Sequence, residues 1–222
     1  MSAVSPIRWT SLSAIVSASA MAVQLAVLSR FLSASQLGVA ALAMMILGLA
    51  TIISDLGINK VLIKEQDDLA PGLRSSLYSL ELILGFAVWI LVWLSSPSFA
   101  RYYAAPELAP LVRHGSISLL MIPIGHQFYC LLSRDLLFKK LAIIEIVSSM
   151  VGLAIAIFGA VLNEGAYAPV WGWAGTILVK YWLIAFVGWR QYPLTPVWEV
   201  QGLLPHLRFG FYATVENIIS YI

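Results

Sequence analysis

Residue types that carry chemistry are scarce in this chain. Of its 222 residues, one is a cysteine and three are histidines. A single cysteine cannot form an internal disulfide, and Cys130 has no obvious base beside it to activate its thiol. His114, His126 and His206 lack the short spacing of metal-binding motifs. The sequence therefore predicts no metal site and no catalytic centre, and we expect a protein that is not an enzyme and needs no cofactor.

Charge is scarce too. Asp, Glu, Lys and Arg make up 11% of the residues, the net charge is only +2, and the glycines are scattered rather than gathered in a phosphate-binding loop. Such a small net charge does not predict a nucleic-acid partner. Hydrophobic residues reach 60% and the mean hydropathy is +0.88. Because a soluble domain averages about half apolar and about a quarter charged residues, this composition predicts a protein that lies in lipid.

Charge-free runs long enough to cross a bilayer recur along the chain. An apolar helix needs about 20 residues to span the hydrocarbon. Five runs without Asp, Glu, Lys or Arg, and a sixth interrupted only by Lys180, cover residues 9–29, 31–54, 82–100, 114–133, 146–163 and 166–189. A seventh apolar segment begins near the end of the chain. We expect an all-α polytopic transmembrane bundle, with residues 1–205 forming six helices and residues 206–222 the truncated start of a second bundle.

The distribution of Lys and Arg predicts the orientation. If the N-terminus is cytoplasmic, the inner segments carry nine Lys or Arg residues and the outer segments carry Arg30, Arg101 and Arg113. Cytoplasmic loops are enriched in these residues, so the bias favours a cytoplasmic N-terminus.

Small residues and one proline indicate how the helices pack. Two ribbons of small residues at i, i+4 spacing predict close helix contact, although a generic Ala-rich helix would show the same spacing. They are Ala14, Ala18, Ala22 and Ala26 in the first run, and Ser148, Gly152, Ala156 and Ala160 in the fifth. Pro123 predicts a bend in the fourth run, which would serve gating or simply shape the packing.

Four charged residues lie at or inside the apolar runs. With a cytoplasmic N-terminus, Asp55, Glu81 and Glu145 share one level near the cytoplasmic face. Lys180 lies ten residues before Arg190, about 15 Å along a helix and near the middle of the bilayer. A charge at that depth costs at least about 2.5 kcal/mol unless it faces a partner or water. Lys180 is therefore either half of a structural Lys–Glu pair or a cation for an anionic ligand.

The remaining charges have simpler explanations. Asp55 is best explained as a helix-end residue, and Glu81 and Glu145 as interfacial residues. All three carboxylates are also candidate partners of buried charge. Arg30 and Arg113 are candidate substrate contacts at the outer mouth of a path, with anchoring at the membrane interface as the stronger explanation.

Three segments carry a resemblance to a known family. The strongest pieces are Ser29 to Gly38, the turn Ser54-Asp55-Leu56-Gly57, and Arg134-Asp135-Leu136-Leu137-Phe138-Lys139-Lys140. In their order and spacing they resemble the polysaccharide flippases of the multidrug/oligosaccharidyl-lipid/polysaccharide exporter superfamily. The likeness is greatest to the lipopolysaccharide and exopolysaccharide branch and covers nearly the whole chain.

The resemblance implies a carrier in the bacterial inner membrane. Such a carrier moves an undecaprenyl-diphosphate-linked oligosaccharide to the outer leaflet, and its fold has two six-helix bundles that open alternately to each side. This chain supplies about one bundle, so its expected partners are membrane lipid, the lipid-linked oligosaccharide, and a missing C-terminal half or a second copy. Lys180 would then attract the diphosphate.

Other classes of membrane protein stay open. A membrane-embedded glycosyltransferase or polymerase that acts on lipid-linked sugars would also be polytopic, but the outer loops hold few acids. A non-transporting fragment fits the length. A cation-coupled drug exporter of the same superfamily is a closer rival, and a carboxylate-lined rather than cationic cavity would favour it.

Overall fold

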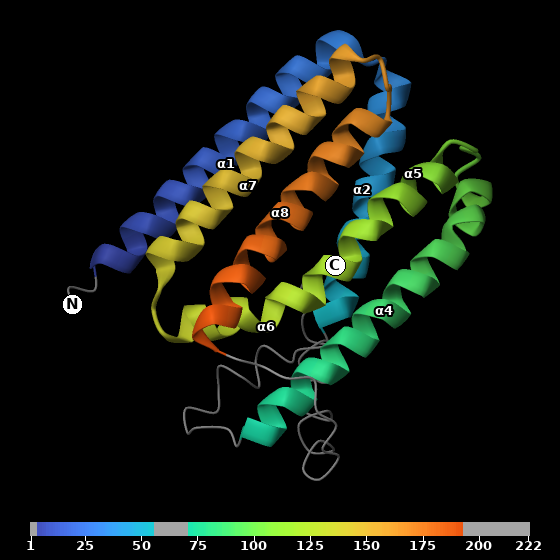
Figure 1. Ribbon diagram of the computed structural model, residues 1–222. Helices are drawn as coiled ribbons and strands as arrows, with labels where there is room; N and C mark the ends of the chain where they lie inside the picture. Colours follow the sequence, from blue (N-terminus) through green and yellow to red (C-terminus); the bar gives the residue numbers. More distant parts are fainter. Residues whose placement is uncertain (1–3, 56–70, 193–222) are drawn as a thin grey trace.

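The structure is a computed structural model that describes residues 4–55 and 71–192. Within these ranges the regular structure is entirely helical (Figure 1). The elements are α1 (Val4–Phe31), α2 (Ala34–Asp55), α4 (Pro71–Tyr102), α5 (Leu108–Ser116), the 3₁₀ helix η1 (Ile117–Leu120), α6 (Met121–Arg134), α7 (Phe138–Val161) and α8 (Tyr167–Gln191). The predicted segment 206–222 lies outside the described residues.

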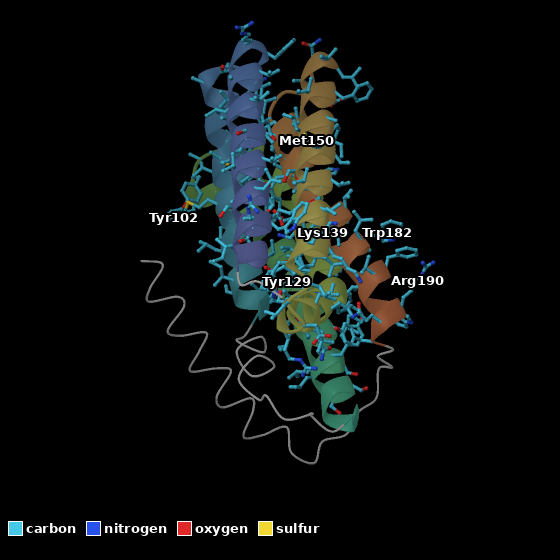
Figure 2. All side chains as sticks on the ribbon, turned by 90° about the vertical axis from the view of Figure 1, so that its left-hand side faces the viewer. Tyr102, Tyr129, Lys139, Met150, Trp182 and Arg190 are labelled. Atoms are coloured by element: carbon cyan, nitrogen blue, oxygen red, sulfur yellow. The ribbon has the colours of Figure 1, made fainter. Side chains whose placement is uncertain are left out.

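Six of these helical stretches can cross a membrane, which confirms the predicted fold class. Five are the long helices α1, α2, α4, α7 and α8, and the sixth is α5, η1 and α6 taken together as Leu108–Arg134. Large apolar side chains such as Leu91, Leu94 and Phe158 are exposed on the bundle. Figure 2 shows side chains projecting from the face formed by α1 and α7, with Trp182 and Arg190 beyond it on α8. Such a surface is stable in lipid and would promote aggregation in water.

Short connections place successive helices antiparallel. Ser33 and Gln36 form a capping box at the start of α2: the Gln36 backbone N–H donates to Ser33 Oγ (3.3 Å) and the Ser33 N–H donates to Gln36 Oε1 (2.9 Å). At the end of α6, Leu136 adopts a left-handed φ of 56°, and the Leu137 N–H donates to the Leu132 carbonyl at 3.0 Å. This Schellman pattern ends the helix and turns the chain into α7.

The small-residue ribbon on α7 makes the closest helix contact. Ser148, Gly152, Ala156 and Ala160 are all buried. A Cβ placed on Gly172 of α8 would lie 2.8 Å from the carbonyl oxygen of Gly152. Because glycine lets the two backbones approach this closely, α7 packs along α8, and the predicted contact on the fifth span is confirmed.

The corresponding prediction for the first span is wrong. The four alanines of the α1 ribbon are exposed. The buried face of α1 instead carries Ser13, Ala20 and Leu28, and Ser17 Oγ hydrogen-bonds Ser149 Oγ of α7 at 2.9 Å. A face with leucine and a hydrogen-bonding serine gains more from contact with α7 than a face with alanine alone.

The fourth span is bent, as Pro123 predicts. The helix changes to the 3₁₀ form over Ile117–Leu120, one turn before the proline, and α6 then runs at a shallower slope than α5 (Figure 1). Pro123 has no N–H to donate to the Leu119 carbonyl, which loosens this turn. Gly85 of α4 lies directly against the proline ring and leaves no room for a side chain there.

Candidate functional site

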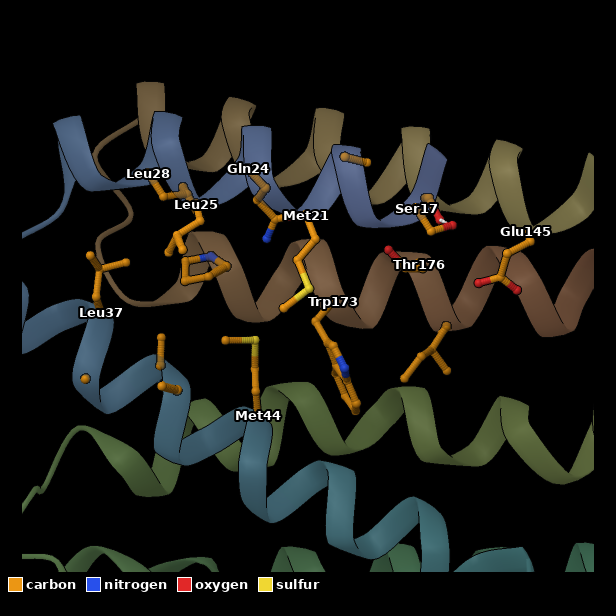
Figure 3. Close-up of a pocket in the computed structure, with 17 residues that line it drawn as sticks. Ser17, Met21, Gln24, Leu25, Leu28, Leu37, Met44, Glu145, Trp173 and Thr176 are labelled. Carbon is orange, nitrogen blue, oxygen red and sulfur yellow. Dashed lines mark hydrogen bonds between the residues drawn. The ribbon is translucent and has the colours of Figure 1, made fainter. Parts of the chain in front are cut away.

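A cavity lies between α1, α2, α7 and α8. Its volume is about 630 Å³, and Figure 3 shows Met21, Met44 and Trp173 pointing into it. Most of its lining is apolar; Ser17, Thr176 and Glu145 lie toward one end, and Gln24 lies nearer the other. The cavity therefore depends on the first two and the last two described helices packing against each other.

The predicted buried lysine pairs with a predicted carboxylate. Lys180 Nζ lies 2.6 Å from Glu145 Oε2, and their side chains are 25% and 31% exposed. The pair joins α8 to α7 beside the polar end of the cavity. The charge that lines the cavity is thus a carboxylate whose field a lysine offsets, so the site is neither purely cationic nor purely acidic.

A second pair of titratable side chains is more deeply buried in the bundle. Glu81 of α4 is only 1% exposed, and its Oε1 lies 2.8 Å from Nδ1 of His126 on α6, whose side chain is 13% exposed. The helices α4 and α7 begin before the charge-free runs, at Pro71 and Phe138. Glu81 and Glu145 therefore lie inside helices rather than at their starts.

Two tyrosine rings stand between the pairs. The His126 ring centroid lies 6.4 Å from that of Tyr129 and 6.0 Å from that of Tyr181. Lys180 Nζ lies 5.9 Å and 6.0 Å from the centroids of the same two rings. The structure thus brings Glu81, Glu145 and Lys180 of the predicted residues into one cluster across four helices.

The other predicted residues lie elsewhere. Arg113 is inside the fourth span rather than at its start: its Nε donates to Ser96 Oγ at 2.9 Å, and its guanidinium covers the Trp93 ring at 4.7 Å. Arg30 is exposed in the last turn of α1. Asp55 ends α2, and its side chain lies outside the described residues.

Sequence reasoning missed His126. The histidines were considered only as metal ligands. Within residues 4–55 and 71–192, no three His, Cys, Asp or Glu side chains lie close enough together to bind a metal ion. A useful signal was present, because a histidine inside an apolar run needs a polar partner. A single sequence does not say which helix supplies that partner.

Comparisons with known proteins point to one family. Residues 27–222 match the family described as polysaccharide biosynthesis protein. Over 222 residues the chain is 34% identical to the teichuronic acid biosynthesis protein TuaB of Bacillus subtilis (strain 168), a match that covers 96% of this chain and 44% of TuaB. It is 28% identical over 219 residues to the lipopolysaccharide biosynthesis protein WzxC of Escherichia coli (strain K12), covering 99% of this chain and 44% of WzxC.

The name of a further relative includes transport. The chain is 27% identical over 200 residues to the succinoglycan biosynthesis transport protein ExoT of Rhizobium meliloti (strain 1021), covering 88% of this chain and 39% of ExoT. The chain spans less than half the length of these relatives. No solved structure matches it. With six stretches in the described residues that are long and apolar enough to cross a membrane, and a family match over residues 27–222, the chain is a multi-pass protein of the bacterial inner membrane and belongs to the polysaccharide biosynthesis protein family.

Proposed function

We propose that this chain forms one helical bundle of a carrier that moves undecaprenyl-diphosphate-linked oligosaccharide or polysaccharide repeat units across the membrane by alternating access. The family match carries the proposal, because relatives with polysaccharide names cover nearly the whole chain. The cavity is the feature that such a role needs. We place the N-terminus in the cytoplasm, so that substrate enters from the inner face.

The cavity fits part of an amphipathic substrate. Its volume of about 630 Å³ lies in the range of about 300–1,000 Å³ that ligand pockets have. The lining of Met21, Met44 and Trp173 suits hydrocarbon, and the polar end suits a headgroup. A whole lipid-linked oligosaccharide is larger. We therefore propose that an opposing wall, from further chain or a second copy, completes the path.

Lys180 is the proposed cation for the diphosphate. In the structure it is held by Glu145, so the substrate would have to replace the carboxylate as its partner. A diphosphate carries more negative charge and more acceptor oxygens than one carboxylate, which makes such an exchange favourable when the headgroup enters. Glu145 would then keep Lys180 ordered in the absence of substrate. Arg30 would hold the outer end of α1 at the interface, and Arg113 would tie α5 to α4 through Ser96 and Trp93.

A set of Lys180 variants in the complete carrier tests this role. Lys180→Ala should reduce polysaccharide export at least tenfold, and Lys180→Arg should keep part of it, because Arg retains the charge with a different geometry. Lys140, exposed in the first turn of α7 and close to Gln191, supplies the matched control: Lys140→Ala should export normally. Membrane abundance is measured for each by immunoblot. Failure of Lys180→Ala to accumulate would favour a purely structural pair.

A charge swap separates the two explanations. Lys180→Glu with Glu145→Lys restores an ion pair between α7 and α8 but moves the cation to the other helix. If the pair only holds the bundle together, the swap should restore both abundance and export. If the position of the cation matters, abundance should return and export should not. Full export by the swapped carrier would overturn the proposed role of Lys180.

A further inference from the structure

The Glu81–His126 pair has no part in the role proposed above. It is the most buried charged contact that the structure describes, with Glu81 1% exposed inside a membrane-spanning helix. A carboxylate in such a place is costly unless a partner compensates it. The pair joins α4 to α6, and His126 lies one turn after Pro123, at the bend of the fourth span.

The pair is neutral only when it holds one proton. With one proton shared between them, the Glu81 carboxyl and the His126 imidazole carry no net charge, whether as an ion pair or as two neutral groups. Losing that proton leaves a net charge of −1, and gaining another leaves +1. Either charge is unfavourable in a dry helical bundle. The proton state of the pair therefore responds to any charge or water that comes near it.

Titratable groups on four helices face the pair. Tyr78 lies one turn before Glu81 on α4, Tyr129 lies on α6, and Tyr181 lies on α8; Lys180 of α8 and Glu145 of α7 stand behind the two tyrosine rings. Side-chain exposure falls from 31% at Glu145 and 25% at Lys180 to 13% at His126 and 1% at Glu81. The Lys180–Glu145 pair is thus the more exposed of the two pairs and Glu81–His126 the more buried.

The spacing of the cluster is held by a close helix contact. A Cβ on Gly125 would lie 2.5 Å from the Tyr181 carbonyl oxygen, so α6 and α8 touch at their backbones beside His126. Both Lys180 Nζ and the His126 ring lie 6.0 Å from the Tyr181 ring centroid, which puts them no more than 12 Å apart. At an effective dielectric constant of about 20, two unit charges about 12 Å apart change each other's binding equilibrium about tenfold.

We propose that Glu81 and His126 form a proton-binding site linked across Tyr129 and Tyr181 to Lys180, so that an anionic headgroup at Lys180 and a proton on the pair stabilise each other. The linkage rests on the proposed anion role of Lys180, whereas the proton site itself rests on Glu81 and His126 alone. In the resting structure Glu145 balances Lys180. A diphosphate adds negative charge beyond that balance, and a proton on the pair offsets it. Such coupling is reciprocal: the proton must raise the affinity for the anion by the factor that the anion raises the affinity for the proton.

Nuclear magnetic resonance of ¹⁵N-histidine in the 222-residue chain, inserted in lipid nanodiscs, tests the proton site. Single His→Gln variants assign the signals. Glu81→Gln should shift the titration midpoint of His126 by about one pH unit or more, because it removes a partner 2.8 Å away. His114, which is exposed and contacts the Pro110 carbonyl, is the internal control and should not move. An unchanged His126 midpoint would overturn the proton site.

A prenyl diphosphate tests the linkage. The ratio of the wild-type affinity for farnesyl diphosphate to the Glu81→Gln affinity should fall at least threefold between pH 6 and pH 8, because loss of its proton leaves the wild-type pair at −1 while the variant pair stays neutral. The ligand's own titration is common to both chains and cancels in this ratio. Farnesol, which has the same tail without the anion, should show no such difference. If Glu81→Gln does not fold, the shift of the wild-type His126 signal on adding farnesyl diphosphate decides instead.

The outcomes separate the two proposals. Binding that Lys180→Ala abolishes, with no effect on His126, would overturn the linkage and leave the role of Lys180 standing. Absence of binding by every variant would overturn the anion role together with the linkage. In either case, the proton site is tested by comparing the titration midpoint of His126 in the wild-type chain with that in Glu81→Gln.

Discussion

The crossing of α7 and α8 gives a sharp prediction about stability. Replacing Gly152 by alanine would put a methyl group against Thr176 Oγ1 and 2.6 Å from the Gly172 carbonyl oxygen. The carbonyl belongs to the backbone of α8 and cannot rotate away, so the helices must move apart. Added methyl groups in packed cores cost about 1–3 kcal/mol. Alanine also favours a helix over glycine by about 1 kcal/mol, so we expect a net loss of up to about 2 kcal/mol.

A matched glycine separates packing from propensity. Gly48 of α2 has no atom within 4 Å of an added Cβ. Gly48→Ala should therefore leave stability unchanged or raise it by up to about 1 kcal/mol. Gly172→Ala, whose methyl group would lie 2.6 Å from the Ala156 Cβ, should behave like Gly152→Ala.

The chain supplies its own probe for this measurement. Cys130 is its single cysteine and is 2% exposed. A dye that fluoresces on reaction with thiols therefore reports thermal unfolding in detergent without any added label. We expect Gly152→Ala to lower the midpoint by up to about 8 °C, since about 1 kcal/mol shifts a domain of this size by about 2–4 °C. Equal midpoints for Gly152→Ala and Gly48→Ala would refute the argument from close backbone contact.

Three further predictions concern topology, helix contact and completeness. With Cys130 removed, cysteines at the exposed positions Lys139 and Lys140 should be shielded in intact cells from a reagent that cannot cross the membrane, and one at exposed Ala104 should react; labelling at 139 would reverse the orientation. Ser149→Ala, which removes the hydrogen bond to Ser17, should lower the free energy of unfolding in the thiol-dye assay by about 0.6 kcal/mol, and a loss above about 2 kcal/mol would contradict this value for one hydrogen bond. Residues 1–222 expressed alone should insert in the membrane without restoring polysaccharide export to a strain that lacks its flippase, and full export by a demonstrated monomer would contradict the need for an opposing wall.

The number and places of the spans could be predicted from the sequence because lipid imposes a simple rule. Every charge inside the hydrocarbon is costly, so charge-free runs mark the helices. Helix ends could not be predicted in this way. The helices α4 and α7 continue past Arg74 and Lys140 into the interface, since backbone hydrogen bonding does not stop where charges begin. This extension is why Glu81 is buried although it precedes an apolar run.

Helix faces were harder to predict than helices. The ribbons on α1 and α7 have the same spacing, yet only the α7 ribbon is buried. The difference lies in the partners: Gly172 of α8 offers a backbone to Gly152, and the alanines of α1 meet no comparable surface in the described residues. The spacing of small residues identifies a helix face. Whether that face is buried depends on whether another helix of the chain has a surface that fits it.

The pairing of charged residues likewise depends on which helices lie side by side. Lys180 was visible in the sequence because it breaks an apolar run, and its partner Glu145 was one of three carboxylates placed at a similar depth. Which carboxylate it would meet depended on α7 lying beside α8, which the close approach at Gly152 brings about. With Glu145 engaged, Glu81 needed another polar partner, and His126 is that partner. Because Gly152→Ala would push α7 away from α8, we expect it also to disturb the Lys180–Glu145 contact.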